Sequence, residues 1–376
     1  MSKIDVMRWA LLAAACLVLA ACRQQDDARS VPVDMTPNWL SEWQLLERQG
    51  SELMLRDDSI AYDLNTPLFS DYARKLRTVW MPEGASARVN ADGVLEFPEG
   101  TVITKTFYYP DAGGRMTTSG IGAFDGRALD VDAVRLVETR LLVRRSDGWE
   151  ALPYVWDDAE QDAELSPAGD IKRLMLEHEG NLMEFPYVVP TKTECASCHA
   201  WDHTAADIRP IGPKVRHLDK SSTWADGSQL NVWMDRGMLA PVDLSTFAQA
   251  AAWPPRPGAD IEHAARSYLD INCGHCHNPV GPADTSGLFL HYEETSLRRL
   301  GACKQPVAAG RGSGGRAVSI APGDPDASIL YFRMQSTDPA QMMPELGRAL
   351  VHKEGVDLIG RWIRALEGEC VQSNSL

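Results

Sequence analysis

Two copies of a Cys-x-x-Cys-His motif lie in the second half of the chain, at residues 195–199 (CASCH) and 273–277 (CGHCH). Two thiols three positions apart lie on one helical turn and can add to the two vinyl groups of a haem. The imidazole of the next residue then lies under the iron as its proximal ligand. The sequence therefore predicts two covalently attached haems c. The residues that hold them are Cys195, Cys198 and His199 for haem 1, and Cys273, Cys276 and His277 for haem 2.

Other chemistries use the same cysteine spacing. Two Cys-x-x-Cys pairs can form a four-thiolate zinc site, and one pair can be a redox-active dithiol. Zinc does not require a histidine directly after each pair, and a thioredoxin-like dithiol expects a βαβ context that this sequence lacks. The repeated histidine favours haem.

The N-terminus has the pattern of an export signal. Lys3 and Arg8 precede an apolar run over residues 9–21, which is too short to span a bilayer. Residues 19–22 (LAAC) resemble the lipobox of bacterial lipoproteins, so we expect residues 1–21 to be a signal peptide and Cys22 to carry lipid. An ordinary cleaved signal without lipid is the alternative. Arg23 after the cysteine favours a periplasmic protein anchored in the outer membrane.

The cysteines of the chain can all be assigned. Of the eight, Cys16 leaves with the signal, Cys22 carries lipid and four hold the haems. Cys303 and Cys370 remain, and an even pair in an oxidising compartment predicts a disulfide. On the loop-entropy model this bond contributes about 4 kcal/mol to stability.

Charge and length narrow the classes of protein. The chain has 37 basic and 52 acidic residues, a net charge of −15, which disfavours nucleic-acid binding and favours cationic protein partners. With 376 residues it is long enough for two or three domains. No second apolar run approaches the length of a membrane span, so the lipid is the expected membrane contact.

The predicted fold class is α+β multidomain. Residues 22–58 are expected to be a lipidated tether and a docking helix, the helix covering residues 37–49. Residues 59–190 alternate with period two and are interrupted by turn residues at 90–93, 147–148 and 179–181, which predicts a β-rich domain, a sandwich or partial barrel. Its predicted strands include residues 102–109, 149–156, 172–177 and 182–189, and a strand with residues 137, 139, 141 and 143 on its buried face.

Two mainly α-helical haem-binding segments are expected to follow, over residues 191–256 and 257–376. The proline-rich residues 253–258 form the predicted linker. Asp260 is the expected N-cap of a helix that leads into the second motif, and residues 356–366 form a terminal helix. The second segment is similar to class I cytochromes c, in which N- and C-terminal helices cross. In this sequence a Gly-Pro pair follows each motif histidine, at residues 212–213 and 281–282.

The sixth iron ligands must come from separate segments of chain. For haem 2, residues 341–347 (QMMPELG) resemble the methionine segment of class I cytochromes c, and Met343 before Pro344 is the predicted ligand, with Met342 second. Met334 is expected to be a core residue. For haem 1 we predict Met238, while Met234, His217 and His178 remain alternatives.

Four stretches together resemble a family of exported dihaem c-type cytochromes of Gram-negative bacteria. They are residues 65–73 (NTPLFSDYA), 152–156 (LPYVW), 210–214 (PIGPK) and 273–279 (CGHCHNP). The resemblance implies a β-rich N-terminal part and two haem-binding segments, without a defined substrate. It also implies a parallel-β-helix protein as a partner.

Two functions remain open from the sequence. In the first, both haems have two axial ligands and the protein transfers electrons between periplasmic redox partners. In the second, haem 1 keeps an open position and the protein is a redox enzyme, peroxidase- or dehydrogenase-like. The short spacing between the two motifs differs from that of dihaem peroxidases, so we favour the carrier.

Overall fold

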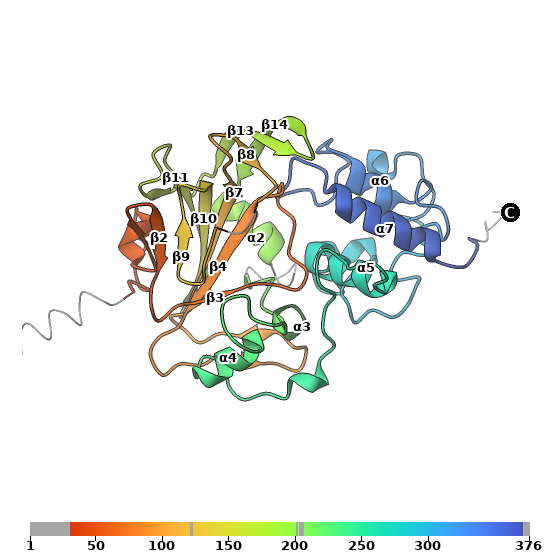
Figure 1. Cartoon of the computed structure of the whole chain (residues 1–376). Coiled ribbons are helices and arrows are strands. Elements are labelled where there is room, and N and C mark those ends of the chain that lie inside the picture. Colours follow the sequence, from red (N-terminus) through yellow and green to blue (C-terminus); the bar gives the residue numbers. More distant parts are fainter. Residues whose placement is uncertain (1–30, 121–122, 201, 203–206, 371–376) are drawn as a thin grey trace, which may run out of the picture.

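The structure is a computed structural model that describes residues 31–120, 123–200, 202 and 207–370. A β-rich region over about residues 40–189 is followed by a mainly helical C-terminal part, as the sequence predicts. Figure 1 shows the helical part lying beside the sheets, with α2 between them. The tether near Cys22 and the signal peptide lie outside the described residues.

A six-stranded antiparallel sheet forms the centre of the β-rich region, with strand order β12-β11-β10-β7-β4-β3. Its strands are β3 (Ile60–Tyr62), β4 (Arg74–Trp80), β7 (Val102–Pro110), β10 (Val134–Arg145), β11 (Gly148–Trp156) and β12 (Ala163–Leu165). Arg145 pairs with Gly148, so the predicted hairpin is confirmed and its turn is one residue earlier than expected, at Ser146 and Asp147.

Three smaller sheets surround the central one. They consist of β1 (Leu46–Gln49), β2 (Glu52–Leu55) and β9 (Ala128–Asp130); β8 (Met116–Thr117), β13 (Asp170–His178) and β14 (Asn181–Val189); and β5 (Arg88–Val89) with β6 (Leu95–Glu96). The turns predicted at residues 90–93 and 179–181 join β5 to β6 and β13 to β14.

The central sheet is buried on both faces. Thr139, Leu141 and Val143 of β10 are fully buried on one face, as predicted, and Leu141 and Val143 pack in a cluster with Trp43 and Tyr154. Val137, predicted on the same face, packs instead in a separate cluster with Phe107 and Tyr187, because the strand register shifts between Leu136 and Glu138. The opposite face is less uniformly apolar. On it, Arg140 and Leu142 of β10 lie beside Lys105 and Ile103 of β7. This second face is turned toward the helical part of the chain.

The predicted helix over residues 37–49 is wrong. The structure has only a 3-10 turn, η1 (Leu40–Trp43), after which Gln44 adopts the left-handed conformation with φ 55° and the chain enters β1. Leu40, Trp43 and Leu46 are nevertheless all buried, because a turn followed by a strand also places residues three apart on the core side.

The C-terminal part contains α2 (Lys192–His199), α3 (Val215–Leu218), α4 (Gln229–Asp235), α5 (Ile261–Leu269), α6 (Ile329–Gln335) and α7 (Lys353–Ala365), with short turns η2 (Leu244–Thr246), η3 (Asp270–Gly274), η4 (Asp284–Ser286) and η5 (Gly310–Ser313). Asp260 Oδ1 accepts hydrogen bonds from two main-chain N–H groups of α5, confirming the predicted N-cap. Ala264 and Ala265 allow α5 to pack closely on Ile359 and Trp362 of α7. Within the described residues, no helix has the length and apolar character needed to cross a membrane.

The segment between β3 and β4, residues 63–73, is here called the strap. Asn65 Nδ2 donates to the carbonyl oxygens of Arg216 and Asp219, at 3.1 and 2.8 Å. The main-chain N–H of Phe69 donates to Asn272 Oδ1 at 2.8 Å. The strap therefore connects the sheet to both predicted haem-binding segments.

Asp71, near the end of the strap, binds the loop that precedes α7. Asp71 Oδ1 accepts the main-chain N–H groups of Ala349 and Leu350, at 2.8 and 2.7 Å. Burial raises the pKa of Asp71 to about 6, even though these hydrogen bonds favour its charged form. The two ends of this contact are far apart in the sequence, so the carboxylate fixes the C-terminal part against the sheet.

The predicted disulfide between Cys303 and Cys370 is confirmed, with the two Cα atoms 5.1 Å apart. It closes a loop of 67 residues around most of the second haem-binding segment. Such a bond limits the conformations of the unfolded chain.

We expect the Cys303→Ser, Cys370→Ser double variant to lose about 4 kcal/mol of unfolding free energy, because its unfolded chain regains the entropy of the open loop. Equilibrium denaturation without reductant, followed by circular dichroism, measures this. Stoichiometric labelling of either thiol in the unreduced native protein would contradict the bridge.

Candidate functional site

The first Cys-x-x-Cys-His motif lies on α2, which begins directly after β14. Thr191 caps this helix: its Oγ1 accepts from the N–H of Glu194 at 3.1 Å, and the Glu194 carboxylate accepts from the N–H of Thr191 at 2.9 Å. Cys195 packs against Ala151 and Ile208 in a small apolar cluster. The motif is thus held against the inward face of the sheet.

His199 has the hydrogen bond expected of a metal-ligating imidazole. Its Nδ1–H donates to the carbonyl oxygen of Arg209 at 2.7 Å, which leaves the Nε2 lone pair available. This carbonyl lies three residues before the Gly-Pro pair at residues 212–213. Burial lowers the pKa of His199 to about 3, so the ring is neutral at pH 7.

The second motif follows α5 through the π-helical turn η3. A Cβ at Gly274 would lie 3.0 Å from the Cα of His291, so the close approach of the two segments requires glycine there. His277 Nδ1 lies 3.4 Å from Ser286 Oγ, and burial lowers the pKa of His277 to about 4. Its Nε2 therefore also retains a lone pair at neutral pH.

Each motif lines a large cavity. Cavity A lies between the sheet face and the helical part, and contains about 1560 Å³ of empty space including the part open to solvent. Cavity B lies mainly within residues 257–376, with Ser197 and Cys198 of the first motif in its lining, and contains about 1620 Å³ by the same measure. Cys195, Cys198 and His199 line cavity A, and Cys273, Cys276 and His277 line cavity B.

The two cavities share a wall. Residues from both motifs and from the methionine loop line both cavities: Cys198, Asn272, Cys273, His275, Met334, Met343, Pro344 and Leu346. The structure therefore brings the two predicted haem sites directly beside each other, although 78 residues separate their motifs.

Cavity A has cationic side chains in a mostly apolar lining. Arg77, Lys105 and Arg140 project from neighbouring strands of the sheet. Glu138 pairs with Arg140 at 2.6 Å, whereas burial and the two arginines lower the pKa of Lys105 to about 7. Arg77 pairs with Asp63 Oδ1 at 3.4 Å, and Lys105 Nζ lies 5.1 Å from the centroid of the Phe107 ring. A ligand that carries carboxylates would supply further anionic partners to this wall.

Cavity B is lined by Met343, its predicted iron ligand, together with His277. Arg348 holds the methionine loop in place: its guanidinium donates to the carbonyl oxygens of Met343, Ser336 and Leu350 at 2.9–3.2 Å. Met342 is buried but is not among the residues lining either described cavity. Met334 is a buried core residue, as expected, and also lines the shared wall.

The structure keeps Met238 away from cavity A. Met238 packs on the outer cluster around Trp233, and its carbonyl accepts from the N–H of Ala87. Met234 packs in the same cluster, and the described lining of cavity A includes neither His217 nor His178. A ligand role for Met238 thus stays a prediction without structural support.

Other side chains with metal-binding atoms do line cavity A. They include His275, His352 and Met343. Burial lowers the pKa of His275 to about 4, and its Nδ1 has no hydrogen-bond partner. His275 is not singled out by the sequence, because it occupies a position that the Cys-x-x-Cys-His motif leaves open.

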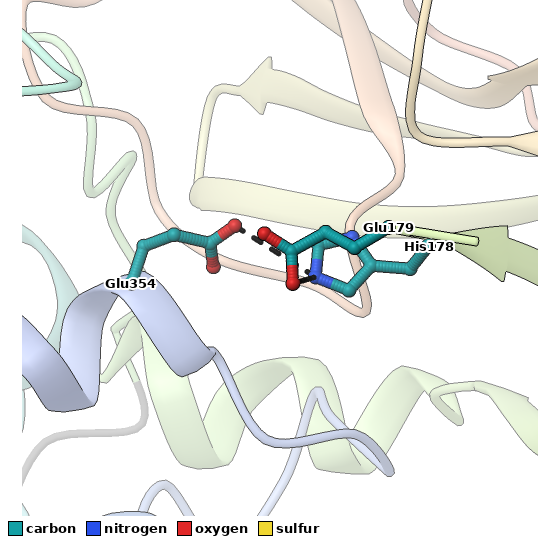
Figure 2. A group of neighbouring side chains, drawn as sticks. All are labelled: His178, Glu179 and Glu354. Carbon is teal, nitrogen blue, oxygen red and sulfur yellow. Dashed lines mark ion pairs between the residues drawn. The ribbon is translucent and has the colours of Figure 1, made fainter. Parts of the chain in front are cut away.

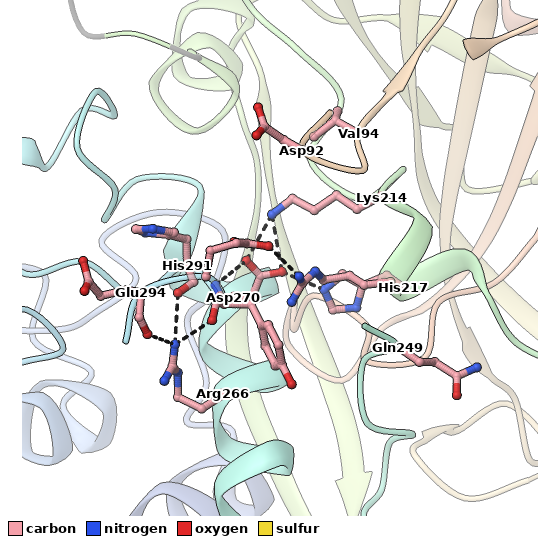
Figure 3. Close-up of polar contacts among 12 residues, drawn as sticks. Asp92, Val94, Lys214, His217, Gln249, Arg266, Asp270, His291 and Glu294 are labelled. Carbon is pink, nitrogen blue, oxygen red and sulfur yellow. Dashed lines mark hydrogen bonds and ion pairs between the residues drawn. The ribbon is translucent and has the colours of Figure 1, made fainter. Parts of the chain in front are cut away.

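A buried carboxylate joins the two haem-binding segments (Figure 3). Asp270 is 1% exposed and lies 3.0 Å from His217 Nε2 and 3.1 Å from Lys214 Nζ. It also accepts the main-chain N–H of Tyr292 at 3.2 Å. Burial alone would raise the pKa of Asp270, but Lys214 and His217 hold it well below its usual range. His217 thus positions the two segments and does not face a cavity.

We expect Asp270→Asn to destabilise the protein by about 3–5 kcal/mol at pH 7, because Lys214 loses its buried counter-charge. Since folding lowers the pKa of Asp270, its contribution is present above about pH 4 and declines as the pH falls further. Denaturation at pH 7 and pH 3 measures both effects.

The control is Asp357→Asn, which removes an exposed i,i+4 pair with Arg361 and should cost less than about 1 kcal/mol. Equal losses in the two variants would show that the buried network has no special role.

Comparisons with protein-family models, curated proteins and solved structures found no match to this chain. The residues themselves are the basis for assigning the site. Two thiol pairs, two neutral imidazoles and a cationic cavity wall fit the attachment points, the axial ligand and the propionates of haem c.

Proposed function

We propose that this protein is a dihaem c-type cytochrome lipoprotein that transfers electrons between periplasmic partners. The observation that carries the proposal is the wall shared by cavities A and B, which contains residues of both motifs. A bound haem takes up and releases one electron at its iron. Two haems held in adjacent cavities could exchange electrons with each other while both stay bound to the protein.

The residues around each motif support haem attachment. Cys195 and Cys198 would hold haem 1, with His199 as its proximal ligand oriented by the Arg209 carbonyl. Cys273 and Cys276 would hold haem 2, with His277 on one side and Met343 on the other. A thioether ligand favours reduced iron and raises the reduction potential, as an electron carrier requires.

Location and partners follow from the sequence. The export signal and Cys22 support a periplasmic protein attached by lipid, with the outer membrane favoured. The net charge of −15 favours cationic redox partners. The parallel-β-helix partner rests on the family resemblance alone.

We expect intact-mass measurement of the purified protein to show two covalent haems and a lipid on the mature N-terminal Cys22. The Cys195→Ala, Cys198→Ala variant should retain one haem, because only one pair of attachment thiols is removed. The Cys303→Ser, Cys370→Ser variant is the matched control and should retain both. A wild-type protein without haem would overturn the proposal.

We expect Met343→Ala to abolish the weak far-red thioether-to-iron band of haem 2 and to lower its reduction potential, because a weaker ligand no longer favours reduced iron. Absorption spectra and potentiometric titration measure both changes. Met342→Ala is the control, since Met342 lies outside the cavity linings.

Loss of the band in Met342→Ala alone would transfer the ligand role to that residue. The wild-type ferric protein should be low-spin at both haems. A high-spin signal would reveal an open iron position at one of them and favour a redox enzyme.

A further inference from the structure

Three side chains with metal-binding atoms converge where the β13–β14 hairpin meets α7 (Figure 2). His178 is the last residue of β13, Glu179 lies in the following turn, and Glu354 lies in the first turn of α7. His178 Nε2 is 3.8 Å from an oxygen of each carboxylate, and the three ligand atoms lie within 4.8 Å of one another. The cluster is separate from cavities A and B.

His178 is the fixed member of the cluster. Its side chain is almost completely buried, and its ring packs against Tyr72 with centroids 4.2 Å apart and ring planes inclined at 31°. Nδ1 lies 3.0 Å from Thr118 Oγ1, while Nε2 is buried without a hydrogen-bond partner. Figure 2 shows this nitrogen directed at the carboxylates. A hydrogen bond at Nδ1 fixes the ring so that Nε2 can bind a metal.

The two carboxylates are suitable partners for a cation. The Tyr72 hydroxyl donates a hydrogen bond to Glu354 Oε2 at 3.0 Å. The other carboxylate oxygen, Oε1, faces His178. Over the described residues, no lysine or arginine lies within ion-pair distance of Glu179 or Glu354. Two negative charges therefore face a buried, unsatisfied nitrogen.

The spacing is close to that of a first coordination shell. A separation of 3.8 Å is too long for a hydrogen bond. Ligand atoms about 2.0–2.1 Å from one tetrahedral zinc ion lie roughly 3.3–3.5 Å apart. The two nitrogen–oxygen distances exceed this spacing by a few tenths of an ångström, and the two carboxylate oxygens, which lie within 4.8 Å of each other, must approach by up to about 1.5 Å. Both glutamates are exposed, so their side chains are free to make this movement. Imidazole with carboxylates suits zinc better than magnesium or calcium, which prefer oxygen ligands alone.

We propose that His178, Glu179 and Glu354 form a zinc site that fastens the β13–β14 hairpin to α7. The ion takes one imidazole nitrogen and two carboxylate oxygens, and water completes its coordination. Because the ligands come from the β-rich region and from the last helix, zinc stabilises the packing between them. The proposal does not depend on haem binding.

The test uses the purified full chain, freed of metal with a chelator and titrated with zinc chloride by calorimetry. We expect each chain to bind one zinc ion tightly, and we expect the melting temperature of the protein to rise when zinc is added. Glu354→Gln and Glu179→Gln should each weaken this binding at least tenfold, and Glu354→Gln should abolish the thermal shift. These variants leave the buried His178 in place, so they preserve the fold.

Glu184→Gln is the matched control, because Glu184 lies on the same hairpin but outside the cluster. It should bind zinc as the wild type does. Absence of tight zinc binding in the wild type, or unchanged binding in Glu354→Gln, would overturn the site. An equal thermal shift with magnesium chloride would overturn the choice of metal.

Discussion

The placement of the strap against the rest of the chain is the constraint on which both cavities depend. Asn65 binds the first haem-binding segment, Phe69 binds the turn before the second motif, and Asp71 binds the loop before α7. The contacts of Asn65 and Asp71 use main-chain groups of the partner segments, whereas the contact of Phe69 uses the side chain of Asn272. The strap also supplies part of the wall of cavity A, through residues 64 and 68–70.

Polar groups are buried at the junctions between segments, and apolar groups fill the segments themselves. Asp270 with Lys214 and His217, and Arg348 with its carbonyl partners, lie where segments from different parts of the chain meet. A buried charge is costly unless it is fully paired. Such groups therefore permit one arrangement of the segments, and that arrangement aligns the cavities along a shared wall.

The features that could be predicted from the sequence are mostly those that depend on a local pattern of residues. The two motifs, the disulfide, the hairpins and the helices at Asp260 and residues 356–366 all follow from spacing or turn chemistry. The helix at residues 37–49 was mispredicted because apolar spacing of three and four fits a turn and a strand as well as a helix. Arg348 and His275 have roles set by distant segments, which leave no local pattern. The ligand role predicted for Met238 stays without structural support, because Met238 packs in the cluster around Trp233 and is not in the described lining of cavity A.

The burial of Cys195 has a consequence for how the protein is made. Its side chain is buried, and the cavity beside it is partly lined by residues between 334 and 352, far along the chain from this motif. Docking of those residues by the strap covers one side of the cavity. For a chain that carries haem as proposed, the macrocycle would reach this thiol most readily before those residues dock, and the docked residues would then cover the cofactor.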